Sequence, residues 1–182
     1  MAEDLVVRFC SPTLAGLKTG GLFVCPFPDG AALRRWLRRL NTRLGGKGLR
    51  VVSLRYRNGK ALIYLYRPER LRRDLDECAA RKILREQGYL PGSAERMLSQ
   101  LAFRLGRGGD FPHEIGLFLG YPPEDVLGFI RDDRPCKCRG CWKVYGDVES
   151  AQRTFAAFKS CTENYCSLFA QGRTLEELAV AG

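Results

Sequence analysis

The sequence predicts an α+β fold in which a small, mostly antiparallel sheet with a β-hairpin packs against about six helices. Three observations lead to this expectation: an alternating stretch around Asn58-Gly59, several segments with apolar residues at helical spacing, and a composition of 45% hydrophobic and 27% charged residues. A chain of 182 residues with this composition can bury one core. We therefore expect a single domain over 1–182, with a basic α/β half over 1–91 and a helical, cysteine-bearing half over 92–182.

Residues 5–28 contain short apolar runs separated by proline and glycine, which predict one short strand over Leu22–Pro26. The piece AGLKT within this region has the residue types of a phosphate-binding loop. However, Leu17 separates Gly16 from Lys18, so the G-x-x-x-x-G-K-[ST] pattern is not met.

Residues 31–44 predict an amphipathic helix, because leucines and Trp36 recur at helical spacing while arginines fill the opposite side. Residues 51–66 then alternate around Asn58-Gly59, a dipeptide that suits a two-residue hairpin turn. In this hairpin we expect Val52, Leu54 and Tyr56 to share one face. Two interpretations of the basic side chains remain open, a solvated surface or an anion-binding face. The candidate anion-binding residues are Arg34, Arg35, Arg38, Arg39, Arg55, Arg57 and Lys60.

The rest of the chain is predicted to be mainly helical, from apolar periodicity and from proline, glycine and capping residues at the ends of segments. One helix, about Val148 to Gln171, carries two cysteines, and a brief helix from Thr174 has Glu177 in the position of a capping box. The expected helices cover 68–87, 93–105, 110–119, 148–171 and 174–179, and a further short helix starts within 121–125 and is ended by 132–135. A short extended segment covers 142–145.

The unequal distribution of charge favours an anionic partner. Residues 1–91 contain 19 Lys or Arg and 8 Asp or Glu, a net charge of +11, whereas residues 92–182 contain 11 and 12, a net charge of −1. The basic half therefore suits nucleic acid or an acidic protein.

The beginning of the chain, MAEDLVVRFC, has acidic residues where a signal peptide needs a basic region. No apolar run reaches the roughly 18 to 20 residues that span a bilayer. We expect a cytoplasmic protein with no membrane span. In that compartment, eight cysteines indicate metal binding, redox chemistry or burial before they indicate disulfides.

The segment 110–147 contains the only histidine and a group of three cysteines. In a helix over 110–119, His113 falls opposite the buried stripe and Glu114 borders it, so the two side chains should not face the same way. His113 has either a structural hydrogen bond or a functional role. A lone histidine lacks the second histidine of a zinc-protease motif.

Cys136, Cys138 and Cys141 lie within six residues, and Cys138-x-x-Cys141 has the spacing of a zinc knuckle. The flanking cations Lys137, Arg139 and Lys143 should favour the thiolate forms. A fourth ligand would come from Cys161, Cys166 or His113. Cys161 and Cys166 are about 140° apart on one continuous helix, so at most one of them joins. Zinc or an iron-sulfur centre, reduced structural cysteines and a redox pair remain alternatives. The predicted ligands are Cys136, Cys138, Cys141 and Cys161.

Several segments together resemble an uncharacterised family of small proteins found mainly in anaerobic bacteria such as clostridia and sulfate reducers. These segments are CSPTLAGLKTGGLF, YRPERL, FPHEIGLFLGYPPEDVLGFI, CKCRGCWKVYGD and CTENYC. Within them, HEIGLFLGYP and GCWKVYGD are specific signatures, and the resemblance covers nearly the whole chain. The resemblance implies no activity, and it directs attention to Cys10, Lys18, His113, Glu114, Trp142, Lys143 and Tyr145.

Three functions follow from these patterns. The first is a metal- or redox-linked accessory protein whose cysteine-rich loop is its working surface. The second is a basic module that binds nucleic acid or an acidic protein, in which case added salt should weaken binding steeply. The third is an enzyme that uses His113 and Glu114 beside a thiolate, for which no complete catalytic motif is present.

Overall fold

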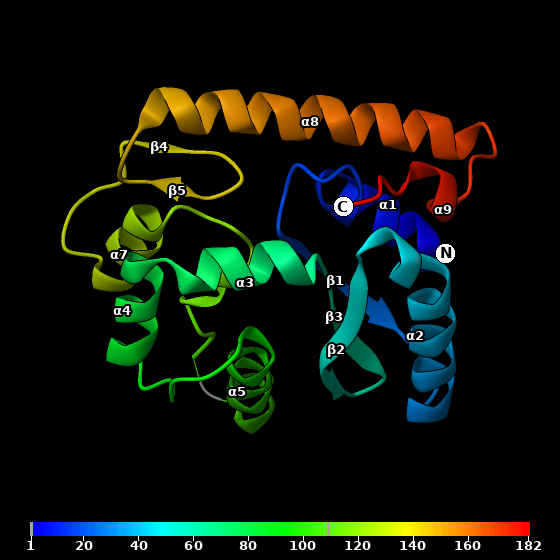
Figure 1. Ribbon diagram of the computed structural model, residues 1–182, viewed down its shortest axis with the longest axis horizontal. Coiled ribbons are helices and arrows are strands. Elements are labelled where there is room, and N and C mark those ends of the chain that lie inside the picture. The colour runs from blue at the N-terminus through cyan, green and yellow to red at the C-terminus, as the bar shows by residue number, and fades with distance from the viewer. Residues whose placement is uncertain (1, 109) are drawn as a thin grey trace.

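The computed structural model describes residues 2–108 and 110–182, which form nine α-helices, one short 3-10 helix and two antiparallel sheets (Figure 1). The predicted α+β class is confirmed, with more helices than expected. The helices are α1 (Ala2–Leu14), α2 (Gly30–Leu44), η1 (Gly45–Lys47), α3 (Pro68–Asp76), α4 (Cys78–Glu86), α5 (Ala94–Arg107), α6 (Ile115–Phe118), α7 (Pro123–Arg131), α8 (Val148–Ala170) and α9 (Leu175–Leu178). The strands are β1 (Gly20–Pro26), β2 (Arg50–Arg57), β3 (Lys60–Tyr66), β4 (Cys138–Arg139) and β5 (Lys143–Val144).

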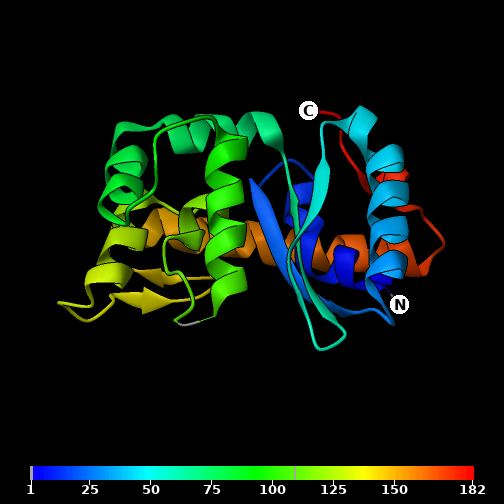
Figure 2. The same ribbon diagram turned by 90° about the horizontal axis from the view of Figure 1, so that it is seen from below.

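The central strand β3 is covered on both faces, because the three-stranded sheet has the order β1-β3-β2 and lies between helices (Figure 2). Alternate residues of β3 enter two different cores. Leu62, Tyr64 and Tyr66 pack with α3, α4, α5 and α6. Ala61, Ile63 and Leu65 pack with α1, α2 and α9. The sheet is therefore the middle layer, and each half of the molecule is built on one of its faces.

The predicted hairpin is present, and its turn has the expected backbone. Asn58 and Gly59 have φ values of 51° and 70°, and Arg57 pairs with Lys60. An irregularity in the pairing between Ser53 and Arg55 changes the alternation of β2. Tyr56 consequently pairs with Ala61, on the α2 side, so the prediction that it shares a face with Val52 and Leu54 is wrong.

The N-terminal helix α1 was not predicted from the sequence. Its buried side chains, Val6, Val7, Cys10 and Leu14, have helical spacing, and Pro12 lies in the last turn. The carbonyl groups at the end of this helix are satisfied by the buried side chain of Arg67. Its guanidinium donates to the carbonyl oxygens of Thr13 at 2.8 Å and Leu14 at 2.7 Å. Arg67 thus ties the end of α1 to the beginning of α3.

Two predicted helices are corrected by the structure. The helix expected over 68–87 is two helices, because the extended backbone of Glu77 (φ −56°, ψ 136°) separates α3 from α4. The helix expected over 110–119 is limited to α6, and Phe111, which precedes it, is 47% exposed. The other predicted helices are present, and the capping box of Thr174 and Glu177 is confirmed.

The long helix α8 crosses the molecule (Figure 1). One end lies beside β4 and β5, and the other lies beside α1 and α9. The cysteine-bearing loop that includes β4 and β5 therefore lies against α8. None of the helices in the described part of the chain has both the length and the apolar character needed to cross a membrane.

Candidate ligand-binding site

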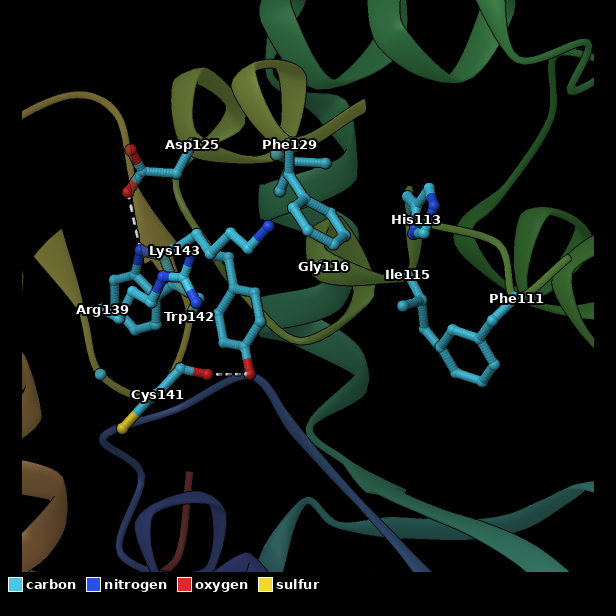
Figure 3. Close-up of a pocket in the computed structure, with 13 residues that line it drawn as sticks. Phe111, His113, Ile115, Gly116, Asp125, Phe129, Arg139, Cys141, Trp142 and Lys143 are labelled. Carbon is cyan, nitrogen blue, oxygen red and sulfur yellow. Dashed lines mark hydrogen bonds between the residues drawn. The ribbon is translucent and has the colours of Figure 1, made fainter. Parts of the chain in front are cut away.

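A cavity of about 360 Å³ lies between α6, α7 and the loop that joins β4 to β5 (Figure 3). Most of its wall is aromatic or aliphatic, with a few polar groups at defined places. The lining residues are Phe111, His113, Ile115, Gly116, Tyr121, Asp125, Val126, Phe129, Arg139, Gly140, Cys141, Trp142 and Lys143. All of them come from the segment that contains the two sequence signatures.

Asp125 holds the loop wall of the cavity against α7. Its carboxylate is only 3% exposed and accepts three hydrogen bonds. The donors are the indole N–H of Trp142 at 2.7 Å and the backbone N–H groups of Tyr145 at 2.7 Å and Gly146 at 2.8 Å. Its place in the first turn of α7 also favours a negative charge. Three donors of the protein itself therefore occupy most of the acceptor positions of this carboxylate.

Trp142 forms the centre of an aromatic stack at the edge of the cavity. Its ring stacks on Tyr121 with centroids 4.7 Å apart and meets the ring of Phe155, on α8, edge-on at 4.5 Å. The Tyr121 hydroxyl donates to the backbone carbonyl of Cys141 at 3.3 Å. Gly140 allows the loop to lie close to Phe155, since a Cβ at position 140 would be 2.2 Å from the Phe155 ring. The wall is therefore fixed from both α7 and α8.

Positive charge and one imidazole lie around the ring of Phe129. The Lys143 ammonium is 4.7 Å from the centroid of this ring, and His113 meets it edge-on at 4.7 Å. Figure 3 shows His113 on the opposite side of the cavity from Arg139 and Trp142. Among the described residues, neither Lys143 nor Arg139 has a carboxylate partner within salt-bridge distance. The cavity thus combines an apolar aromatic wall with two cations, of which Arg139 also interacts with the side chain of Cys136.

His113 and Glu114 lie in different environments. His113 is exposed at the cavity, whereas Glu114 is buried and accepts a hydrogen bond from the hydroxyl of Tyr89 at 2.9 Å. Burial and the neighbouring Glu114 raise the pKa of Tyr89. Arg104 lies 3.8 Å from the same carboxylate. Glu114 is therefore part of the packing between α5 and α6, and the structure does not bring it to His113 at one reaction centre.

Lys18 approaches the cavity wall from the outside, although it is far from the wall in sequence. Its ammonium lies 5.0 Å from the centroid of the Tyr121 ring, near the thiols of Cys10 and Cys141. Burial lowers the pKa of Lys18, and the nearby thiols partly oppose this. Burial also raises the pKa of the Cys10 thiol to about 12. The resemblance singled out both residues, and the structure places them behind the same wall.

The cysteines of the loop have different neighbours. Cys136 lies beside Arg139 and raises the pKa of that guanidinium, whereas Cys141 lies beside Lys18. Burial raises the pKa of Cys141 and outweighs the effect of Lys18, so for this residue the expectation of a favoured thiolate is wrong. Cys161 lies on the inner side of α8, where burial raises its pKa.

Cys138 is half-buried in β4, where it pairs with Val144. In residues 2–108 and 110–182, no three His, Cys, Asp or Glu side chains are grouped in a way that could hold a metal ion. The metal ligands Cys136, Cys138, Cys141 and Cys161 stay a prediction from the sequence.

The remaining candidates are distributed between the core and a distant surface. Tyr145 is buried, and its ring would be 2.4 Å from a Cβ at position 128, where the chain has glycine. The seven candidate anion-binding residues are all exposed on α2 and on the hairpin, at the other end of the molecule from β4 and β5 (Figure 1).

Sequence reasoning did not identify Tyr121, Asp125, Phe129 or Phe155 as parts of the site. Asp125 was interpreted as an ordinary acid in the first turn of a helix. No spacing rule connects it with Trp142, because the contact depends on how the loop folds back. The concentration of aromatic residues with two prolines around Tyr121 was the available signal.

Comparison with known proteins gives a family and no activity. Residues 6–179 match a family model described as "Protein of unknown function (DUF3793)". No curated protein and no solved structure matches the chain.

Proposed function

The chain belongs to the family described as protein of unknown function (DUF3793), and from its site we propose that it binds a small, flat organic anion in the cavity beside Trp142. The observation that carries this proposal is the aromatic wall with Lys143 and Arg139 beside it and no free carboxylate among its lining residues. The family assignment agrees with the resemblance, and an origin in anaerobic bacteria remains a prediction.

The size and composition of the cavity support a ligand of limited size. Small-molecule sites usually have volumes of about 300 to 1,000 Å³ and an apolar lining with a few polar groups. At about 360 Å³, this cavity is at the small end of that range. The aromatic rings of Trp142 and Phe129 offer surfaces on which a planar ligand can pack.

The charges at the site favour an anionic group on the ligand. Lys143 and Arg139 carry full positive charges, while Asp125 is already satisfied by three donors. Arginine binds carboxylate or phosphate with two parallel hydrogen bonds, and lysine adds a point charge. His113 can supply one more hydrogen bond to the ligand.

Fluorescence titration with 8-anilinonaphthalene-1-sulfonate tests this proposal, with N-phenyl-1-naphthylamine as its matched neutral analogue. We expect the sulfonate to bind more tightly. Lys143→Gln should weaken binding of the sulfonate by about 10- to 150-fold, which corresponds to one charged hydrogen bond of roughly 1.5 to 3 kcal/mol. The same change should leave the affinity for the neutral probe unchanged. Lys137→Gln removes a nearby charge outside the cavity and serves as the control. Equal binding of both probes, or an equal effect of both variants, would contradict the proposal.

We also propose a cytoplasmic location and an anionic macromolecular partner, supported by the sequence and by the exposed cations of α2 and the hairpin. A zinc or iron-sulfur centre at the four cysteines named above is a separate proposal that rests on their spacing. The location of the tagged protein in cells checks the first of these proposals, and the metal content of the purified protein checks the last.

A further inference from the structure

The outer side of α2 and the tip of the hairpin both carry groups of exposed cations. Buried Leu33, Trp36 and Leu40 turn the other side of α2 into the core, so its arginines extend into solvent. These two groups are together called the basic face: Arg34, Arg35, Arg38 and Arg39 of α2, and Arg55, Arg57 and Lys60 of the hairpin, all exposed. The hairpin cations lie on the side of the sheet away from α2, because Arg55 pairs with Leu62 and Arg57 with Lys60.

Several other arginines of the protein have acidic partners, whereas in the part of the chain that the structure describes the cations of the basic face do not. At the end of the same helix, Arg43 forms ion pairs with Glu3 and Glu176. Four more arginines pair with nearby carboxylates in the same way, namely Arg72, Arg81, Arg153 and Arg173. Within the described residues, none of the seven cations of the basic face has such a partner. The carboxylate of Asp29 caps α2 through the N–H of Ala32.

The basic face also contains like charges at positions where they repel each other. Arg57 and Lys60 are directly opposite in the hairpin, an arrangement that destabilises a sheet. Arg34 and Arg38 are four residues apart on α2, as are Arg35 and Arg39, which destabilises a helix. A bound polyanion would remove this repulsion.

An aromatic ring lies among these cations. Tyr56 is 37% exposed, and its hydroxyl donates to the backbone carbonyl of Phe27 at 3.2 Å, which holds the ring in place. Gly30, at the beginning of α2, lies between this ring and Arg34. A Cβ on Gly30 would be 4.0 Å from the ring and 3.3 Å from the Arg34 guanidinium. Tyr56, which pairs with Ala61, therefore lies on the side of the hairpin that faces α2 and its arginines.

We infer that the basic face binds single-stranded nucleic acid, with phosphates on the arginines of α2 and a base stacked on Tyr56. Proteins that bind single strands combine a positive track for the backbone with aromatic rings on which bases stack. An acidic protein would use the cations but would gain no stacking from the ring. The inference names the anionic partner proposed above and is independent of the cavity.

Fluorescence anisotropy of the full chain with labelled oligothymidine and oligouridine of about 20 nucleotides tests this inference. One variant carries Arg34→Gln, Arg35→Gln, Arg38→Gln and Arg39→Gln. Its matched control carries Arg72→Gln, Arg81→Gln, Arg153→Gln and Arg173→Gln, which removes the same charge from exposed arginines that have partners. Glutamine keeps the helix propensity close to that of arginine. Thermal unfolding confirms that each variant is folded.

We expect the native protein and the control variant to bind similarly, and the α2 variant to bind weakly. The slope of log affinity against log salt should fall by about 0.7 for each lost phosphate contact, or roughly 3 for four contacts. Tyr56→Leu should weaken binding by about 5- to 150-fold, the effect of one lost base stack, whereas Tyr56→Phe should retain binding. Comparison of the two oligonucleotides shows whether the sugar matters.

Three results would overturn the inference. The first is an absence of binding at about 50 mM salt. The second is an equal loss of affinity in the α2 variant and its control, which would show that only net charge matters. The third is competition by polyglutamate as strong as that by unlabelled oligonucleotide, together with no effect of Tyr56→Leu, which would indicate an acidic protein. Titration of the same variants with 8-anilinonaphthalene-1-sulfonate reports on the cavity independently. A failure of the nucleic-acid inference can therefore be distinguished from a failure of the cavity proposal.

Discussion

The indole N–H of Trp142 donates a hydrogen bond of 2.7 Å to the carboxylate of Asp125, and this bond joins the loop between β4 and β5 to α7. The same carboxylate accepts the two backbone N–H groups that follow β5. One buried acid thus determines both the path of the loop and the position of the indole. The cavity has its shape because this acid is satisfied by the loop itself.

Asp125→Asn should lower the free energy of unfolding by about 1.5 to 3 kcal/mol. An amide can accept the two backbone N–H groups with its oxygen, but its NH₂ group then faces the indole N–H of Trp142 as a second donor. Urea unfolding measures this change in the free energy of unfolding. Glu124→Gln, in the same turn but exposed, should change stability by less than about 0.5 kcal/mol. Equal stability of the two variants would show that Asp125 is not the anchor of the loop.

Gly140→Ala should destabilise the protein and weaken probe binding, because the added Cβ would be 2.2 Å from the ring of Phe155. The ring or the start of α8 has to move, at a cost of about 1 to 3 kcal/mol. The control is Gly106→Ala in α5, where nothing lies within 4 Å of the added carbon. That change should be neutral or stabilising by about 0.5 to 1 kcal/mol. Thermal unfolding and near-ultraviolet circular dichroism follow both variants.

Cys10 should make the stability of the protein fall with rising pH above the ordinary thiol range. Burial raises the pKa of the folded thiol from 9.0 to about 12, so the unfolded chain releases this proton first. Between these values the folded state holds more protons, and its advantage, complete below pH 9.0, is lost as pH rises. The native protein should therefore lose more unfolding free energy over this range than Cys10→Ala. Parallel pH profiles would contradict this assignment.

The metal prediction from the sequence has its own measurement. In protein purified without oxygen, we expect stoichiometric zinc or the visible absorption of an iron-sulfur centre. Cys138→Ser should remove the metal, and Cys166→Ser should not. Because Cys136 and Cys141 have different neighbours in the structure, their joint ligation would turn the loop and alter the fluorescence of Trp142. Metal-free protein with unchanged fluorescence after addition of zinc would exclude this centre.

Local signals in the sequence predicted part of the fold well. Asn58-Gly59 defined the hairpin, and Thr174 with Glu177 defined the start of α9. The helix α1 was missed because Pro12 and the glycines after it were interpreted as interruptions, although the helix continues through Pro12 to Leu14. The break at Glu77 has no glycine or proline to announce it.

The candidate site could be predicted only in part. The sequence indicated the correct segment, since Trp142, Lys143 and His113 all line the cavity. It gave no sign that Asp125 would be the buried anchor or that Lys18 would lie beside the ring of Tyr121. Such contacts depend on which loop folds back on which helix, and residue spacing does not determine this.

The packing of α1 against α8 has a consequence for how the protein is made. The first helix leaves the ribosome long before its partner α8 is synthesised, and the side chain of Arg67 also holds the carbonyl oxygen of Val180 at 2.8 Å. Domains are completed only when all their segments have emerged. The contacts of α1 with α8 therefore form only after α8 has been synthesised, whereas those of α1 with β1 can form earlier.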